Sequence, residues 1–502
     1  MGETNAPERA DVIVVGGGNA AFCAAHAARE AGADVLMLEK APQDEAGGNS
    51  FYTAGAVRVA HGGAEALAPI LDEATRARLP ETELAPYSEA DFAADLHRVT
   101  EGRCDPAMVE IVVGKSTETA EWLHRVGIRW RLMYERQAYE SGGKQVFWGG
   151  LALGTVDGGK GLIADHTAAA ERSGIRIRYE SPVTGLLQDE SGAIVGVRFR
   201  DAGGTEREAR AGAMVIAAGG FEADADRRAK HLGAGWERAL VRGNPVNTGE
   251  VLDMAINAGA ARHGDWASCH STAWDAGAPP QGGNRELTNQ LTRQSYPIGI
   301  VVNRDGKRFL DEGADFRNYT YAKYGAEILK QPGGVAWQLF DAKTRPLLRT
   351  EEYDSHPITY AEANTLEELA AALGIDAAGL RATVDEFNDS IVDAPFDPTI
   401  KDGRAARVEP PKSNWSQALD APPFYGYAVT CGITFTFGGV HVDDHGQVLT
   451  ESGSPLPGLY AAGELVGGLF SGNYPGGSGL IAGAVYGRLA GTTAATPTPP
   501  QP

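Results

Sequence analysis

The chain has 502 residues, of which 43% are hydrophobic and 22% are charged. This composition is typical of a globular protein with two or three domains and excludes collagen-like or wholly disordered chains. Lys and Arg total 45 against 66 for Asp and Glu, so the formal net charge is −21. That charge disfavours partners such as nucleic acid or an anionic membrane surface, and an anionic ligand requires a local basic pocket.

The cysteines and the apolar runs bear on the compartment. The four cysteines show no C-x-x-C spacing and are far apart in the sequence: Cys23, Cys104, Cys269 and Cys431. They therefore predict no disulfide framework and no zinc or iron–sulfur site. The first residues lack a signal-peptide pattern, and no apolar run approaches the roughly 20 residues of a spanning helix. We expect a cytoplasmic protein with no membrane insertion.

The first 40 residues predict a strand, a glycine turn, a helix and a second strand. Strands are expected at 12–15 and 35–38, with a helix at 20–28 between them. The turn reads Gly16-x-Gly18-x-x-Ala21, the dinucleotide fingerprint, in which the glycines bring the backbone to a pyrophosphate at the helix's positive end. The alternative is a glycine-rich turn of an ordinary α/β domain. The cofactor contacts predicted in this unit are Gly16, Gly18, Asn19, Ala20, Glu39, which is placed to bind a ribose hydroxyl, and Lys40.

Two further glycine clusters favour FAD over a nicotinamide cofactor. One follows the second strand at once, and the other follows a late strand at 458–464. Extended FAD needs protein contacts at both of its ends, and a helix beginning near Ser478 can direct its amide groups at the flavin. The additional cofactor contacts predicted are Gly48, Asn49, Ser50, Gly219, Gly463, Glu464, Ser478, Gly479 and Leu480.

The rest of the chain is predicted to contain further strands and helices, and one region, described below, has a different sequence pattern. The predicted elements are a helix at 158–173, strands at 175–179, 182–188, 193–200 and 214–218, a hairpin of 298–303 with 308–310, and a closing helix at 478–490. Residues 264–421 form the candidate inserted domain. The Thr-, Ala- and Pro-rich residues 492–502 are expected to be a disordered tail.

Several motifs together resemble the fumarate reductase and succinate dehydrogenase flavoprotein superfamily. They are the fingerprint, Gly47-Gly48-Asn49-Ser50, the segment 303–309 (NRDGKRF), Gly438-Gly439-Val440 and the segment 458–464 (GLYAAGE). The resemblance covers about residues 10–491. Segments 312–321 (EGADFRNYTY) and 473–480 (NYPGGSGL) look most like FAD-dependent tricarballylate dehydrogenase.

The resemblance implies an α/β fold, a Rossmann-type FAD-binding domain (GR2-like) with an inserted α+β capping domain. The expected parts are residues 1–263 and 422–491 for the FAD-binding domain, 264–421 for the cap and 492–502 for the tail. The active site is expected in the cleft between the domains. FAD is expected to be noncovalent, because the histidine that succinate dehydrogenases use for attachment is replaced here by Phe51 or Tyr52.

The resemblance also implies desaturation, or its reverse, of a carbon–carbon bond beside a carboxylate or carbonyl. A substrate carbon gives hydride to flavin N5 while its neighbour gives a proton to a protein base. Arg317 matches the superfamily's arginine base and can also clamp a carboxylate. His270 and Tyr474 match positions that hold the substrate.

The chain departs from fumarate reductases at two positions. Their histidine before the glycine pair falls in the segment 434–437 (TFTF), and their second substrate arginine is replaced by Tyr474. Fumarate is thus disfavoured, and a small polycarboxylate, with tricarballylate to cis-aconitate as the type reaction, is preferred.

Two other functions stay open. Tyr474 with Pro475 and Gly476 resembles the tyrosine motif of 3-ketosteroid dehydrogenases, although Arg317 stands where those enzymes have a tyrosine base. The third possibility is a flavoprotein electron carrier or biosynthetic partner. A separate electron acceptor, either a protein or a quinone-linked partner, is expected because the chain has no C-x-x-C-H haem motif.

One late segment carries potential metal ligands. His441-Val442-Asp443-Asp444-His445 combines imidazoles with carboxylates, but its position at a strand–turn junction favours a solvated hairpin.

Overall fold

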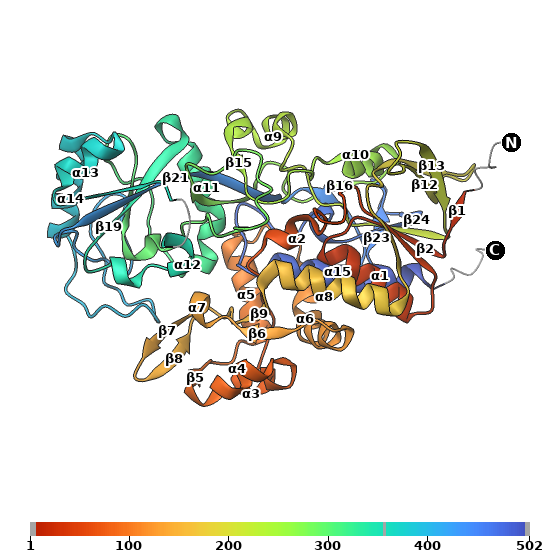
Figure 1. Ribbon diagram of the computed structural model, residues 1–502, viewed down its shortest axis with the longest axis horizontal. Helices are drawn as coiled ribbons and strands as arrows, with labels where there is room; N and C mark the ends of the chain where they lie inside the picture. The colour runs from red at the N-terminus through yellow and green to blue at the C-terminus, as the bar shows by residue number, and fades with distance from the viewer. Residues whose placement is uncertain (1–6, 355–357, 497–502) are drawn as a thin grey trace.

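A computed structural model describes residues 7–354 and 358–496 (Figure 1). Its central sheet has the order β10-β3-β2-β14-β24-β23, parallel throughout except for β23, which is antiparallel to β24. The strands are β2 Val12–Val15, β3 Val35–Leu38, β10 Arg176–Arg178, β14 Ala213–Ile216, β23 Gln447–Leu449 and β24 Pro455–Ala461. Residues from both ends of the sequence thus share one sheet.

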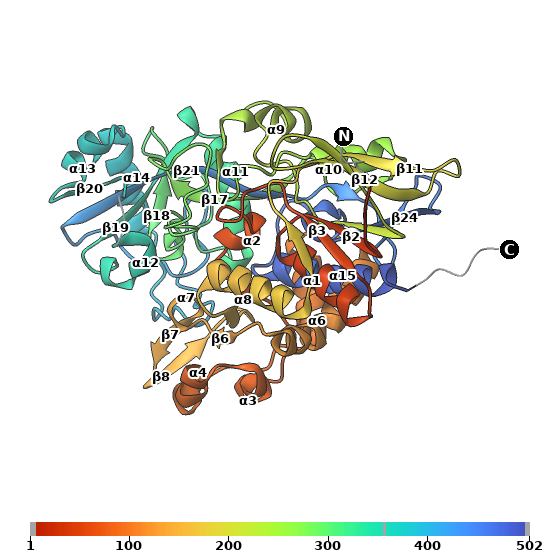
Figure 2. The ribbon, with the colours of Figure 1, turned by 45° about the vertical axis from the view of Figure 1, so that its right-hand side comes forward.

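The central sheet is a buried parallel sheet because its first strands are uninterrupted apolar runs. All residues of β2 and β3 are buried, as expected where both faces of a sheet are covered. Helices α1 (Asn19–Glu30), α8 (Gly158–Ser173) and α15 (Ser478–Ala494) run side by side along it (Figures 1 and 2). The contact between α1 and α15 is close, since a Cβ on Gly491 would lie 2.1 Å from the carbonyl oxygen of Ala24.

A second sheet has the order β1-β13-β12-β11 and lies next to the central sheet, at the end of the molecule opposite the cap (Figure 1). Its strands are β1 Glu8–Arg9, β11 Val183–Gln188, β12 Ile194–Arg200 and β13 Glu206–Arg210. Helices α9 (Ala225–Leu232) and α10 (Glu250–Asn257) follow in the sequence. Strands β16 (Arg262–His263) and β22 (Gly439–Val440) form a short antiparallel pair.

The cap occupies the other end of the long axis (Figure 1). In its sheet, of order β15-β21-β19-β18, strand β21 also pairs with β17 and β20. The strands are β15 Leu240–Val241, β17 Cys269–Asp275, β18 Ile300–Val302, β19 Val335–Asp341, β20 Tyr360–Ala363 and β21 Phe424–Thr436, and the helices are α11 Tyr321–Leu329, α12 Thr350–Tyr353, α13 Leu366–Leu373 and α14 Ala377–Asp389. Strand β21 extends this sheet past residue 421, and the chain then returns to the central sheet at β23.

A third region is built from residues 48–155. Its helices are α2 Gly48–Tyr52, α3 Ala64–Leu67, α4 Glu73–Arg78, α5 Glu89–Val99, α6 Pro106–Val126 and α7 Tyr134–Gln137. Its strands are β4 Ala56–Val57, β5 Thr82–Glu83, β6 Trp130–Leu132, β7 Ala138–Ser141, β8 Lys144–Phe147 and β9 Leu153–Thr155. Helices α3 and α4 and strands β5, β7 and β8 form the lower edge of the molecule in Figure 1.

The hairpin predicted after residue 298 forms only in part. Strand β18 forms, the Asn303 amide donates to the Lys307 carbonyl oxygen at 2.9 Å across the predicted turn, and Val302 pairs with Arg308 in a single antiparallel bridge. The segment 308–310 does not continue as a strand, and β18 pairs with β19 instead. Arg308 donates to Glu312 and to the carbonyl oxygen of Pro410, which hold it outside the sheet.

The two ends of the described chain also bear on the predictions. Helix α15 continues to Ala494, into the segment expected to be a tail, and residues 497–502 lie outside the described residues. Within residues 7–354 and 358–496, no helix is both long and apolar enough to cross a membrane.

Candidate active site

A cleft of about 600 Å³ runs from the glycine turn after β2 to the underside of the cap. At its nucleotide end it is lined by predicted cofactor residues: Gly16, Gly18, Asn19, Ala20, Glu39, Lys40, Gly48, Asn49 and Ser50. At its cap end it is lined by His270, Tyr321, Phe435 and Tyr474. Gly219, Gly463, Glu464, Gly479 and Leu480 lie along its walls.

The glycine turn lets backbone form the wall at the nucleotide end. Gly16 has φ of 118°, and a Cβ there would lie 2.4 Å from the carbonyl oxygen of Ala217. A Cβ on Gly17 would lie 2.6 Å from Oε2 of Glu39. Helix α1 then begins at Asn19, and Gly18, Asn19 and Ala20 all line the cleft, so the positive end of the helix faces it. This arrangement fits the pyrophosphate of a dinucleotide.

The predicted acid Glu39 is buried at the end of β3. Burial raises the pKa of its carboxyl group, although a hydrogen bond from the Ala41 amide to Oε1 (2.8 Å) opposes the change. Its neighbour Lys40 donates to Thr248 at 2.9 Å and pairs with Glu250 at 3.3 Å.

Two other predicted cofactor residues, Asn49 and Ser50, line the cleft and also form hydrogen bonds with neighbouring segments. The side chain of Asn49 donates to Glu222 (2.6 Å) and to the carbonyl oxygen of Thr434 (2.7 Å) and accepts from the Asn244 amide (2.8 Å). Ser50 accepts from the Asn19 amide at 3.0 Å. Ser478, in contrast, is buried behind the cleft wall rather than lining it.

Two carboxyl groups lie together beside the cleft: Glu464, which lines it and is partly buried, and Glu222, which is fully buried. Burial and the neighbouring Glu222 raise the pKa of Glu464 well above its ordinary value. Oε1 of Glu222 accepts from Asn49 and Asn247, and its Oε2 has no hydrogen-bond donor among the other described groups. A single proton shared by the pair, on Glu464, therefore satisfies both carboxyl groups.

A smaller cavity of about 80 Å³ adjoins the cap end of the cleft and shares Tyr321 and Tyr474 with it. Four arginines line this cavity: Arg136, Arg242, Arg317 and Arg349. They come from α7, from the segment after β15, from a short turn before α11 and from the residue before α12. The basic pocket that a strongly acidic chain needs for an anionic ligand is thus present here.

Two of these arginines are paired with acids. Arg136 contacts Glu351 and, at 3.1 Å, Glu352, and Arg349 donates to Glu352 at 2.7 Å. Burial opposes ionisation of Glu352, but Arg349 and Arg136 outweigh it and lower the pKa of that carboxyl group. Burial and the like charge of Arg349 lower the pKa of Arg136 to about 10.

The other two arginines keep free N–H groups. Arg317 is buried with its guanidinium 4.8 Å from the centre of the Trp148 ring, and its Nε and Nη1 have no partner among the described residues. Arg242 donates from Nη1 to Thr434 at 2.9 Å, whereas its Nε has no partner in the same part of the chain. Buried N–H groups of this kind need an acceptor, which a ligand or an ordered water molecule can supply.

An aromatic cluster lies at the cap end of the cleft, beside the small cavity. His270 contacts Phe435, Tyr321 and Tyr474, with ring centres 4.9 to 5.2 Å apart. Burial, with Arg242 nearby, lowers the pKa of His270 well below its ordinary value, so the ring is neutral. Tyr321 donates to the hydroxyl of Tyr474 at 2.8 Å, and the Gly477 amide donates to the same hydroxyl at 3.1 Å.

The structure thus places the predicted residues His270 and Tyr474 at the cap end of the cleft and Arg317 in the small cavity that adjoins it. Sequence reasoning missed Arg136, Arg242, Arg349, Glu222 and Tyr321. Only Tyr321 carried a signal, since it follows Arg317 by four positions inside a motif already recognised.

The glycine turn, the parallel sheet and the cleft define a flavin-binding α/β protein. Residues 11–481 match the model of a family described as "FAD binding domain", and the chain belongs to that family. The predicted fold class and the predicted cofactor, FAD, are confirmed.

The chain is also similar in sequence to individual oxidoreductases. A fumarate reductase (cytochrome) from Shewanella frigidimarina is 28% identical over 487 residues, covering 97% of this chain and 77% of that protein. A 4-oxocyclohex-2-ene-1-carboxylate 5-dehydrogenase from Sinomonas cyclohexanicum is 31% identical over 357 residues, covering 66% and 59%.

Among solved structures, a flavocytochrome c3 fumarate reductase in its open conformation superposes with a TM-score of 0.72 at 26% identity, covering 97% of this chain and 78% of that one. The prediction that the chain is an FAD-dependent oxidoreductase is confirmed by these similarities.

Proposed function

We propose that the protein transfers two hydrogens across a carbon–carbon bond of a small polycarboxylate, of the tricarballylate to cis-aconitate type. The observation that carries this proposal is the pair of buried guanidinium groups, on Arg317 and Arg242, whose free N–H groups line a small cavity beside the cleft. A carboxylate is the acceptor that satisfies a guanidinium with two parallel hydrogen bonds.

The charge around the small cavity supports an anionic substrate. Four guanidinium groups line it, and the acids paired with them are Glu351 and Glu352, so two positive charges stay unbalanced by these acids. Unbalanced buried charge is costly, and an anionic ligand removes that cost. The volume of about 80 Å³ favours a compact polar end group over a steroid ring system.

Each group in the proposed site has a separate role in the reaction. FAD, when bound, accepts or supplies hydride at N5. Arg317 moves the proton at the neighbouring substrate carbon and holds a carboxylate. Neutral His270 and the hydroxyl of Tyr474 orient the substrate against the cleft wall, and the aromatic cluster excludes water from the reacting atoms.

Noncovalent FAD and a separate electron acceptor complete the proposal. Tyr52 lines the cleft, and it is one of the two residues, with Phe51, that replace the histidine to which succinate dehydrogenases attach the flavin. The four cysteines are buried and free within the described residues, so they offer no cluster for passing electrons onward.

The test is anaerobic addition of tricarballylate to the holoprotein while the visible flavin absorbance is followed. We expect bleaching with tricarballylate and none with 4-androstene-3,17-dione, because the cavity binds anions. Unchanged absorbance with tricarballylate, in protein whose flavin is still reduced by dithionite, excludes that substrate.

A second candidate substrate is a ring ketone that carries a carboxylate. The hydrogen-bonded pair of Tyr321 and Tyr474 favours it, because paired hydroxyls can polarise a carbonyl group while the arginines hold the acid. The Sinomonas relative is named for such a compound.

Tyr474→Phe distinguishes these two substrates. If the substrate is a ketone, we expect turnover to fall about 100-fold, the scale of one lost oxyanion-type donor. If it is a polycarboxylate, we expect a loss of less than about tenfold, since the arginines supply the main contacts.

A further inference from the structure

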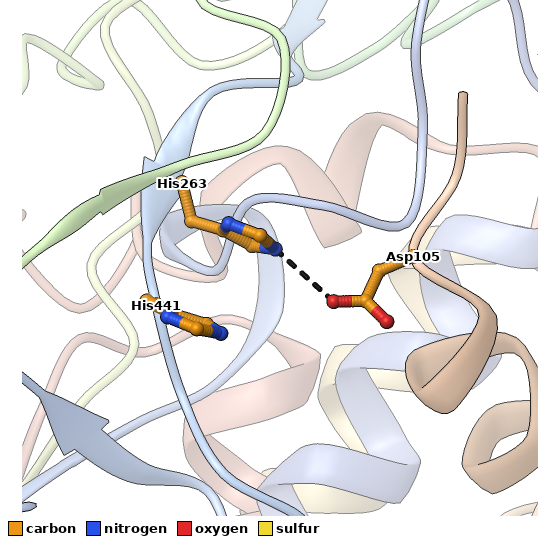
Figure 3. Close-up of side chains that lie close together, drawn as sticks. All are labelled: Asp105, His263 and His441. Atoms are coloured by element: carbon orange, nitrogen blue, oxygen red, sulfur yellow. Dashed lines mark hydrogen bonds and ion pairs between the residues drawn. The ribbon is translucent and has the colours of Figure 1, made fainter. Parts of the chain in front are cut away.

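Three potential metal ligands lie together outside the arginine pocket: Asp105, His263 and His441 (Figure 3). One ligand atom from each lies within 4.8 Å of the others. Nε2 of His263 is 3.2 Å from Oδ2 of Asp105, and the two imidazole rings stack with centres 4.1 Å apart at 21°. Figure 3 shows both ring edges directed toward the carboxylate.

Three separate segments hold these side chains in place. His263 ends β16 and pairs with Gly439 of β22, while the amide of His441 donates to the carbonyl oxygen of Ala261. The two histidines are therefore diagonal neighbours on one face of the short ladder. Asp105 is the N-cap of α6, where its Oδ1 accepts from the Ala107 amide, so its Oδ2 is left to face the histidines.

A glycine makes room for this arrangement. A Cβ on Gly468 would lie 2.6 Å from Nε2 of His263 and 2.9 Å from Sδ of Met108. The Gly468 carbonyl oxygen also accepts from the Asp105 amide at 2.9 Å. One loop thus positions the carboxylate and leaves space at the imidazole.

We propose that Asp105, His263 and His441 bind a borderline divalent transition-metal ion, for which Zn²⁺ is the probe. Two imidazoles with one carboxylate is a ligand set that suits such ions, and it leaves a coordination position for water. Hard cations such as Ca²⁺ and Mg²⁺ prefer oxygen ligands throughout and are not expected to compete.

Binding requires a small contraction of the site. With bonds of about 2.1 Å, ligand atoms on a tetrahedral ion lie roughly 3.4 Å apart, so the atoms that now span up to 4.8 Å must close by about an ångström. The metal also displaces the hydrogen that links His263 to Asp105. Binding is therefore expected to stiffen the contact between β16, β22 and the start of α6.

Nearby charges favour a cation here. Two negative charges, those of Asp105 and Glu451, lie near His441. Met108, one turn into α6, lines the flavin cleft. The proposed ion would thus lie close to the cleft wall while being held by residues that do not line the cleft themselves.

The test is zinc titration of untagged holoprotein by calorimetry after chelator treatment and desalting. We expect one saturable Zn²⁺ per chain and a raised melting temperature. His441→Ala and His263→Ala are each expected to weaken binding at least tenfold. His445→Ala is the matched control, because it removes an exposed histidine from the same turn and should leave the affinity unchanged.

Asp105→Asn provides a second test of the proposal if a histidine variant fails to retain FAD. It preserves an oxygen that can cap α6 but removes the charge, so we expect intact flavin absorbance with weaker zinc binding. The proposal is overturned if wild-type protein shows no saturable binding. It is equally overturned if the His441→Ala or Asp105→Asn variant binds zinc as tightly as wild type, or if His445→Ala weakens binding as much as His441→Ala does.

Discussion

The two ends of the cleft are built in opposite ways. At the nucleotide end the wall consists of backbone and small residues, such as Gly16 and Gly18, held within one β2–α1–β3 unit. At the cap end, the small cavity that adjoins the cleft is lined by long charged side chains, Arg136, Arg242 and Arg317 among them, from segments far apart in the sequence. The nucleotide end is built within one short unit of the chain, whereas the cap end carries buried N–H groups that lack acceptors among the described residues.

Because of this difference, we expect the two ends of the cleft to govern different properties, stability at the nucleotide end and turnover at the cap end. Backbone amides at a helix end bind the invariant phosphates of a cofactor without needing particular side chains. Buried guanidinium groups destabilise the empty site and become favourable when a carboxylate arrives. Substitutions at the cap end should therefore change turnover with FAD retained, and substitutions at the helix contact beneath the nucleotide end should change stability.

The largest effect is expected from Arg317→Gln. Glutamine removes the charge and the proton-carrying group while retaining polar volume, so the rate of flavin reduction by substrate should fall about 1,000-fold. Stopped-flow measurement of flavin bleaching gives this rate directly. Arg304→Gln, at an exposed arginine of the cap, is the control and should react like wild type. Full activity of Arg317→Gln would remove this residue from the mechanism.

A smaller effect is expected from Arg242→Gln. Loss of one charge-assisted contact to a substrate carboxylate costs about 1.5–3 kcal/mol, so KM should rise about 10- to 100-fold. The value of kcat should change little, because Arg242 is proposed to hold substrate rather than to move a proton. A fall in kcat at constant KM would instead place Arg242 in the chemical step.

The two ends also differ in how well the sequence predicted them. Strands β2 and β3 and helix α1 follow from local apolar runs and a glycine turn, and the predicted ranges agree with the structure within two residues. The cap-end arginines could not be predicted in the same way, since Arg136 and Arg349 belong to no motif and meet only through tertiary packing.

The hairpin after residue 298 is predicted only in part. Residues 298–310 have the local pattern of two strands about a turn, and the turn forms, but Arg308 pairs with the buried acid Glu312 and donates to the carbonyl oxygen of Pro410. A buried ion pair with additional carbonyl contacts outweighs the local preference for a strand. The contact with Pro410 joins distant parts of the chain, so a local sequence pattern does not indicate it.

The helix contact beneath the nucleotide end is tested by Gly491→Ala. The added Cβ would lie 2.1 Å from the Ala24 carbonyl oxygen, so α1 and α15 must separate, and we expect the free energy of unfolding to fall by about 1–3 kcal/mol. Gly114→Ala in α6 is the matched control. Its Cβ meets no described atom within 4 Å, so better helix propensity should stabilise the protein by about 0.5–1 kcal/mol. Denaturant unfolding of both holoproteins measures the two changes.

The smallest effect concerns pH and the acid pair Glu222 and Glu464. Because burial and Glu222 raise the folded-state pKa of Glu464, its contribution to stability is complete below the unfolded pKa near 4.5 and is lost as the pH rises toward the raised value. Glu464→Gln keeps a donor toward Glu222 at every pH. As the pH rises from 6 to about 9, the melting temperature of the Glu464→Gln variant should therefore fall by a few degrees less than that of wild type. Glu451→Gln, at an exposed acid, should follow wild type; parallel curves for all three proteins would show that the pair shares no proton.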